Sequence, residues 1–243
     1  MSFSKYCMSA AVIGALNVSV IAGPEWVEQG DAGSLPANAQ SVNGGGGTLQ
    51  KISGAILGAG LNGAGDFEDM YLIQITDPAA FSATTTFVGG GDAQFDTQLW
   101  LLKVDGLGLL GNDDTLIYGP PGFSDGKVVS GSTLGPMATD GTRQTIPGAG
   151  LYLLAISGKF DVPNSQGGHI FSFANSIEIS GPDGPGGTQP IINWQNVGLE
   201  DGSQFGSTGT YTISLTGSAT VPAPSGLAAL AALGCFGRRR RFV

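Results

Sequence analysis

Cysteine is absent from almost the whole of this chain. Its two cysteines, Cys7 and Cys235, lie near the two ends of the 243 residues. Without the terminal segments that carry them, the protein has no thiol, no disulfide and no cysteine-ligated metal site. A central body of about 200 residues does not need such cross-links, because a chain of that length buries a substantial hydrophobic core.

Positively charged residues are also few. Between the two terminal segments, nineteen acidic residues face five cations, which gives this body a formal net charge of −14. The five cations are Lys51, Lys103, Lys127, Arg143 and Lys159. Because a protein that binds nucleic acid needs cations to displace phosphate counterions, we exclude nucleic acid as a partner. The acidic charge instead favours divalent cations.

Histidine occurs once, as His169 at the start of the apolar segment HIFSF. A single histidine cannot supply the H-E-x-x-H motif of metalloproteases. We therefore expect a protein that is not an enzyme. One alternative stays open, an envelope hydrolase that uses either His169 in a triad assembled in space or a pair of carboxylates.

Residues that favour helices are scarce as well. Glycine fills 42 positions, lysine and glutamate are rare, and β-branched residues are abundant, which favours strands. Eight segments bounded by Gly, Asp, Asn or Pro are predicted to be strands. They are KISGAIL (51–57), DMYLIQIT (69–76), FSATTTFV (81–88), TQLWLLKV (97–104), DTLIYG (114–119), GLYLLAIS (150–157), HIFSF (169–173) and TYTISLTG (210–217). The predicted fold is all-β, a β-sandwich or jelly roll of about eight or more strands.

Two of these strands carry nearly continuous apolar runs, LWLL (99–102) and LYLLAI (151–156). Such runs predict central strands that are covered on both faces. The β-sandwich domain is assigned to residues 51–219, with a long Gly/Pro/Ser-rich insertion at 161–205. A loosely ordered entry segment, residues 23–50, is expected to precede it.

The N-terminal segment, residues 1–22, has the layout of a secretory signal peptide. One cation, Lys5, is followed by an apolar run without charge, and the small residues Val20 and Ala22 stand where signal peptidase selects its site. We predict a short signal helix that is removed between Ala22 and Gly23. The mature protein would then be exported.

The C-terminal segment, residues 220–243, combines prolines, a short apolar run and arginines. Gly226 to Gly237 would span about 18 Å as a helix, against a hydrocarbon core of about 30 Å. A short apolar helix of this kind would hold the chain at a membrane, and the arginines favour the cytoplasmic side. The extended motif before it is Val221, Pro222, Ala223 and Pro224, and the arginines are Arg238, Arg239, Arg240 and Arg241.

This arrangement of signal peptide, body, proline motif, apolar run and arginine cluster resembles the PEP-CTERM class of bacterial sorting signals. The resemblance covers Val221 to Arg241, with Ala223 where the commonest form has glutamate. It implies cleavage by a membrane sorting enzyme, an exosortase, after transient anchoring through the tail. The protein would then belong to the cell envelope, the outer surface or the extracellular matrix, as a structural or adhesive module.

The body resembles a second family, the bacterial pre-peptidase C-terminal domains, which are small β-sandwiches of secreted proteins. The similar segments are DFEDMYLIQI (66–75), DTQLWLLKVDGLGLLGNDD (96–114), GAGLYLLAISG (148–158) and GTYTISLTG (209–217). These segments share a sequence pattern in which a strand is followed by an acidic turn. The resemblance implies a non-enzymatic β-sandwich.

Several of the acidic turns form a candidate calcium site. Calcium takes six to eight hard oxygen ligands on flexible loops, and glycine-rich turns supply backbone carbonyls without steric cost. The candidate ligands are Asp66, Glu68, Asp69, Asp105, Asn112, Asp113 and Asp114, with Asp92 and Asp96 in a neighbouring turn. The candidates from Asp105 to Asp114 are assigned to one hairpin-like acidic loop, VDGLGLLGNDD (104–114). The alternative is that Asp, Asn and Gly are simply good turn formers.

The tryptophans suggest one ligand contact. Trp100, within LWLL, is expected in the core, whereas Trp194 lies in the polar stretch PIINWQNVG and is expected to be exposed. Trp194 is therefore the candidate contact for a polysaccharide or protein ligand. An accessory module that binds extracellular polysaccharide or protein remains a further alternative function.

Overall fold

The computed structural model describes residues 25–59, 65–118, 126–196 and 207–222. The predicted signal helix, its cleavage site at Ala22 and Gly23, the apolar tail helix and the four arginines lie outside these ranges and stay predictions. Within the described ranges the protein is all-β and has several sheets. The one helical element there is a 3-10 turn, η1 (Phe87–Gly89). No helix in this part of the chain has the length and apolar character needed to cross a membrane.

The first of the two larger sheets is built around β19. Its strand order is β1 (Glu25–Val27), β3 (Lys51–Ile56), β19 (Gly209–Thr216), β7 (Ser82–Thr84) and β13 (Thr133–Leu134), and β8 (Asp92–Ala93) also pairs with β19. The strict alternation in β19 determines its orientation, since Tyr211, Ile213 and Leu215 are buried while the residues between them are more exposed.

The second sheet is built around β9 and β14. Its strand order is β17 (Ile179–Ser180), β10 (Gly108–Asn112), β9 (Thr97–Lys103), β14 (Gly150–Gly158), β6 (Glu68–Ile75) and β2 (Gln40–Ser41), and β20 (Ser218–Ala219) also pairs with β6. The predicted strands at 69–76, 97–104 and 150–157 correspond to β6, β9 and β14.

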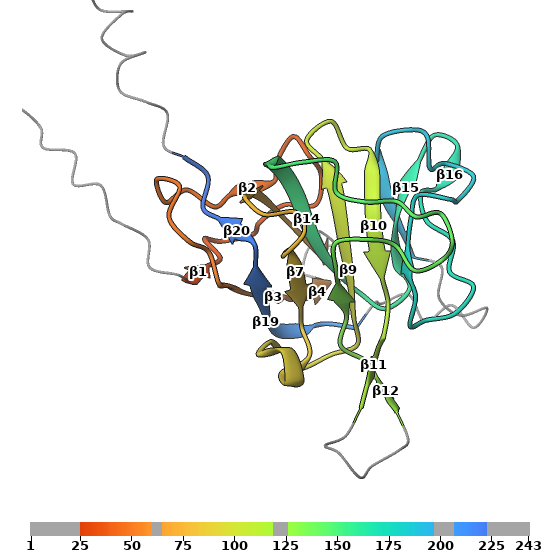
Figure 1. Cartoon of the computed structure of the whole chain (residues 1–243), viewed down its shortest axis with the longest axis horizontal. Helices are drawn as coiled ribbons and strands as arrows, with labels where there is room; N and C mark the ends of the chain where they lie inside the picture. Colours follow the sequence, from red (N-terminus) through yellow and green to blue (C-terminus); the bar gives the residue numbers. More distant parts are fainter. Residues whose placement is uncertain (1–24, 60–64, 119–125, 197–206, 223–243) are drawn as a thin grey trace, which may run out of the picture.

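One hydrophobic core joins the two sheets. Alternate residues of the second sheet, such as Tyr71, Leu99 and Leu154, share a buried cluster with Ile52 and Ile213 of the first sheet. Figure 1 shows the two sheets as neighbouring layers, with β3, β7 and β19 in one layer and β9, β10 and β14 in the other. The sheets therefore bury their facing sides against each other.

A second core covers the opposite face of the second sheet. Met70, Trp100 and Leu153 point to this side and pack with Phe171 and Ile191 of the 161–196 segment. In Figure 1, β15 and β16 of this segment lie beyond β10, on the side away from β19. The prediction that the LWLL and LYLLAI strands are central and covered on both faces is confirmed, because each strand contributes to both cores.

The remaining strands form three small sheets. They are β4 (Gly58–Ala59) with β5 (Gly65–Asp66), β11 (Thr115–Ile117) with β12 (Lys127–Val129), and β16 (Gly168–His169), β15 (Asp161–Ser165) and β18 (Asn193–Asn196) in that order. The β11–β12 hairpin projects from the body (Figure 1).

Several sequence-based expectations differ from the structure. FSATTTFV (81–88) is a strand only over Ser82–Thr84, and its end forms the 3-10 turn η1. HIFSF is a strand only at His169. The Ile170 amide donates to Pro163 O, and the Ile170 carbonyl accepts from the Gly184 amide, so this residue does not continue the β-ladder. The described part of the entry segment, residues 25–50, is packed into the fold. Its strands β1 and β2 pair in parallel with β3 and β6, and it buries Ala32, Val42 and Leu49.

Candidate functional site

Acidic side chains gather in two places in the described structure. In each place, one carboxylate oxygen from each of three residues lies within 4.8 Å of the other two. We call Asp31, Asp66 and Asp69 the Asp69 cluster, and Asp96, Asp113 and Asp114 the Asp113 cluster. The structure therefore places four of the seven predicted calcium ligands in two separate clusters and adds Asp31, which the turn pattern did not identify.

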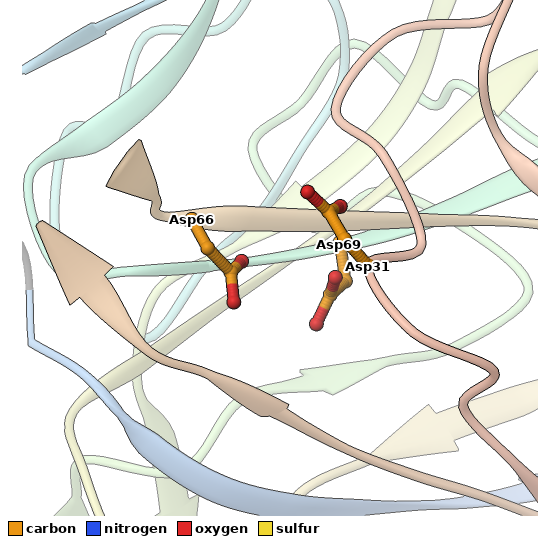
Figure 2. Close-up of side chains that lie close together, drawn as sticks. All are labelled: Asp31, Asp66 and Asp69. Carbon is orange, nitrogen blue, oxygen red and sulfur yellow. The ribbon is translucent and has the colours of Figure 1, made fainter. Parts of the chain in front are cut away.

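The Asp69 cluster is assembled from three segments of the chain. Asp31 lies in the loop between β1 and β2, Asp66 ends β5, and Asp69 is the second residue of β6 (Figure 2). The loop is attached to β6, because the Met70 amide donates to Gly33 O at 2.8 Å and the Gly33 amide donates to Asp31 Oδ1 at 2.6 Å. The parallel pairing of β2 with β6 keeps this loop beside the start of β6.

Asp69 is fully buried, and only one of its carboxylate oxygens has a hydrogen-bond donor. Tyr211 Oη donates to Asp69 Oδ2 at 2.6 Å, and the Tyr71 and Tyr211 hydroxyls lie 2.6 Å apart. Oδ1 of Asp69 has no donor, and the buried Oδ1 of Asp66 has none either. The nearby amide of Ala32 donates to Glu28 Oε1, and it also lowers the pKa of the Asp69 carboxyl group. Two buried carboxylate oxygens therefore lack a partner within the described residues.

The charges of this cluster act on one another. Burial, together with the negative charges of Glu28 and Asp66, raises the pKa of Asp69 to about 8, although the Tyr211 hydrogen bond opposes this increase. Burial likewise raises the pKa values of Asp66 and Glu28. None of the main contributions to these shifts comes from a lysine or an arginine. The cluster is thus an acidic site without a positive side chain of its own.

A hollow adjoins this cluster on the first sheet. It has a volume of about 410 Å³, and its lining includes Glu28, Gly54, Asp92 and Tyr211. Glu28 and Tyr211 line this hollow, whereas Asp31, Asp66 and Asp69 do not. The arrangement can bind a cation, and its chemistry is that of an oxygen-rich ligand set.

Glu68, a predicted ligand, belongs to neither cluster. Burial, followed by a hydrogen bond with the carboxyl group of Asp161, raises its pKa to about 10. Asp161 is itself buried, with its pKa raised by burial. Such a pair of buried carboxyl groups retains a proton that bridges them.

The Asp113 cluster differs because it contains its own cation. Lys159 Nζ lies 2.9 Å from Asp96 Oδ2, and this ammonium lowers the pKa of Asp113, which burial and the charges of Asp114 and Asp96 raise to about 6. Lysine supplies here the positive charge that the Asp69 cluster lacks.

The prediction that Asp105 and Asn112 belong to one acidic loop is wrong. Asp105 lies in the β9–β10 turn, where its Oδ1 accepts from the Leu107 amide. Asn112 is the last residue of β10, at the opposite end of this strand from the turn. Asn112 is buried, donates to the carbonyls of Asp114 and Glu178, and accepts from the Thr133 amide. Asp105 thus acts as a turn former, as the alternative proposed, whereas Asn112 connects the end of β10 to neighbouring backbone groups.

The expectation that Trp194 is exposed is also corrected, whereas its contact with a ligand stays a prediction. Its ring is half-buried against the second core at 6.3 Å from Trp100, and its indole nitrogen donates to Ser34 O at 2.6 Å. His169 is half-buried in β16. Within the described residues, no hydrogen bond joins its imidazole to a serine hydroxyl or a carboxylate.

Replacement of Asp113 by asparagine is expected to stabilise the protein at neutral pH. A carboxyl group whose folded pKa is raised from about 4 to about 6 contributes stability that is present below pH 4 and is lost as the pH rises through 6. At pH 7 we expect a gain of about 1–2 kcal/mol after solvent screening, or a melting temperature raised by roughly 2–8 °C. Thermal unfolding between pH 4 and 8 measures this gain.

Asp105→Asn is the matched control for this prediction, because it preserves the acceptor of the β9–β10 turn outside the cluster. The electrostatic account of the Asp113 cluster fails if Asp113→Asn lowers the melting temperature at pH 7, or if both variants respond alike to pH.

Comparisons with protein-family models, with curated proteins and with solved structures found no match to this chain. The resemblances to the PEP-CTERM signals and to the pre-peptidase C-terminal domains therefore remain predictions based on the sequence.

Proposed function

We propose that this chain is an exported, non-enzymatic protein of the cell envelope or extracellular matrix, in which a structural β-sandwich is delivered by a removable signal peptide and a PEP-CTERM-like tail. Signal peptidase and an exosortase-type enzyme are its transient partners. The membrane is a transient contact through the tail before processing.

The observation that carries this proposal is that both described cores are built from residues that lie between the two predicted sorting signals. β1 begins at Glu25, two residues after Gly23, and the last bridge pairs Val221 with Asn43. Removal of residues 1–22 and of the chain after the proline motif would remove none of the described residues that form the two cores.

The fold also restricts where a processing enzyme could cut. The Val221 amide donates to Val42 O at 2.7 Å, the Gly44 amide donates to Val221 O at 3.3 Å, and Thr220 is fully buried. Because a protease needs an accessible, unpaired backbone, we expect cleavage on the C-terminal side of Val221.

A body of this kind suits a structural role. The second sheet is covered on both faces, and its central strands β9 and β14 are fixed in two cores. The described residues contain no cysteine, so their stability does not depend on the redox state outside the cell.

Mass spectrometry of the mature protein tests this proposal. The full-length chain would be produced in cells that encode an exosortase and recovered from the envelope or the medium. We expect an N-terminal peptide that begins at Gly23 and a C-terminal peptide that ends between Pro222 and Gly226.

The matched control replaces Arg238–Arg241 by alanine. Without the positive charge that stops export, this variant should leave the cell with Val243 still attached. Recovery of intact chains from the cytosol, with Met1 and the four arginines present, would overturn the proposal.

A further inference from the structure

We propose that the Asp69 cluster binds one calcium ion, held by carboxylate oxygens of Asp31, Asp66 and Asp69. This inference goes beyond the proposed function and does not depend on how the chain leaves the cell. It rests on the burial of Asp69, the spacing of the oxygens and the lack of a competing cation.

The burial of Asp69 points to a ligand that the protein itself does not supply. Its side chain is 0% exposed, and Oδ1 has no donor, although Tyr211 satisfies Oδ2. Asp66 repeats this pattern, since Oδ2 accepts from the Leu57 amide while the buried Oδ1 has no donor. Buried carboxylate oxygens are normally paired or bound to a metal, because an unpartnered buried charge is costly.

The spacing of the three residues fits one calcium ion. Calcium–oxygen distances are about 2.3–2.6 Å, so two ligands on opposite sides of the ion are about 4.6–5.2 Å apart. Carboxylate oxygens of the three residues all lie within 4.8 Å of one another. Magnesium requires shorter distances and a nearly ideal octahedron, which suits this open set of carboxylates less well.

The surroundings keep these carboxylates available to an ion. Glu28 is not a fourth ligand, because its two oxygens accept from the amides of Ala32 and Ala55. Its charge still adds to the negative potential of the site. Asp31 is exposed, so water can complete the six to eight oxygen ligands of calcium.

The two acidic clusters behave differently toward a cation. In the Asp113 cluster, the Lys159 ammonium already lies 2.9 Å from Asp96. In the Asp69 cluster, no described lysine or arginine forms an ion pair with a member. We therefore expect calcium to prefer the Asp69 cluster, where it would tie the β1–β2 loop to β5 and β6.

The test is thermal unfolding of the full chain in 1 mM CaCl₂, in 1 mM MgCl₂ and in EDTA. If free calcium is about 100 times the dissociation constant, the melting temperature should rise by about 5–10 °C over EDTA. Asp66→Asn and Asp31→Asn should each lose most of this shift. Both asparagine variants keep a side-chain oxygen that accepts the hydrogen bond from the nearby backbone amide. Because Asp31 is exposed, Asp31→Asn is not expected to impair folding.

Asp113→Asn is the matched control and should keep the full calcium shift. The inference is overturned if wild-type protein shows no shift, if magnesium produces an equal shift, or if the Asp31 and Asp66 variants keep it. Loss of the shift in Asp113→Asn alone would also overturn it, by assigning the ion to the other cluster. All of these measurements use purified protein, so their failure is separable from a failure of the sorting proposal.

Discussion

Replacement of Trp100 by alanine is expected to lower the free energy of unfolding by about 4 kcal/mol, and the melting temperature by roughly 8–16 °C. The Trp100 side chain is fully buried on the side of β9 that faces the 161–196 segment. Its ring lies 5.3 Å from Phe171 and 5.8 Å from Phe173, measured between ring centroids. Its indole nitrogen donates to Ser157 Oγ at 2.9 Å.

The size of this effect follows from the packing around the ring. Gly111 is paired with Trp100 across the β9–β10 ladder, and a β-carbon there would lie 2.7 Å from Trp100 Cε3. The backbone of β10 therefore lies directly against the ring, and a strand cannot collapse to fill the cavity that alanine would leave. The lost hydrogen bond also leaves the buried Ser157 hydroxyl with one partner fewer.

Chemical denaturation monitored by far-ultraviolet circular dichroism measures this loss. Trp100→Phe is the matched control, because it keeps most of the aromatic volume and should lose less than half as much stability. A loss below about 1 kcal/mol in Trp100→Ala would mean that the second core contributes little to stability.

The strands that the sequence predicted well are those with strong local signals. In β19, the alternation of Tyr211, Ile213 and Leu215 with polar residues specifies one buried face, and the structure shows that face in the first core. In β9 and β14, continuous apolar runs indicate burial on both sides. These patterns depend on residues that are neighbours along the chain.

β10 was missed because its glycines are typical of a turn. GLLGN was assigned to an acidic loop, yet it forms a buried strand. Gly111 lies where the Trp100 ring crosses the neighbouring strand, so glycine is required by close packing and not by a turn. Only the position of Trp100 in three dimensions reveals this requirement.

The candidate site was predicted in part for a similar reason. Asp66 and Asp69 are close along the chain, and the turn pattern identified both. Asp31 joins them only because β2 pairs in parallel with β6, and no local pattern encodes that pairing. Glu68 was included by sequence proximity, although alternation along β6 separates its side chain from that of Asp69.

Trp194 was predicted to be exposed, although its side chain is half-buried. Its neighbours in the sequence are polar, and the residues beside it in β18 are exposed. However, the strand presents the indole ring alone to the second core, where it packs at the edge of Trp100. A polar segment with one aromatic residue therefore covers a core as readily as it forms a binding surface.

Replacement of Gly54 by alanine is expected to lower the free energy of unfolding by about 3 kcal/mol. Gly54 lies in β3 opposite Tyr211, and a β-carbon there would lie 2.5 Å from both the Tyr211 hydroxyl oxygen and Glu28 Oε2. The added methyl group must displace both side chains. Tyr211 would lose its hydrogen bond to Asp69, and Glu28 would lose its bond to the Ala55 amide.

Gly148→Ala is the matched control, because no atom beyond its chain neighbours lies within 4 Å of the added carbon. That variant should be as stable as the wild type or slightly more stable, since alanine reduces the entropy of the unfolded chain. Urea denaturation of both variants in EDTA measures the difference without a contribution from bound calcium. Equal stabilities would show that Tyr211 and Glu28 move aside at little cost, and that the hydrogen bonds around Asp69 do not hold β3 and β6 together. A selective loss in Gly54→Ala would show instead that the close approach at this glycine keeps Tyr211 on the buried carboxylate.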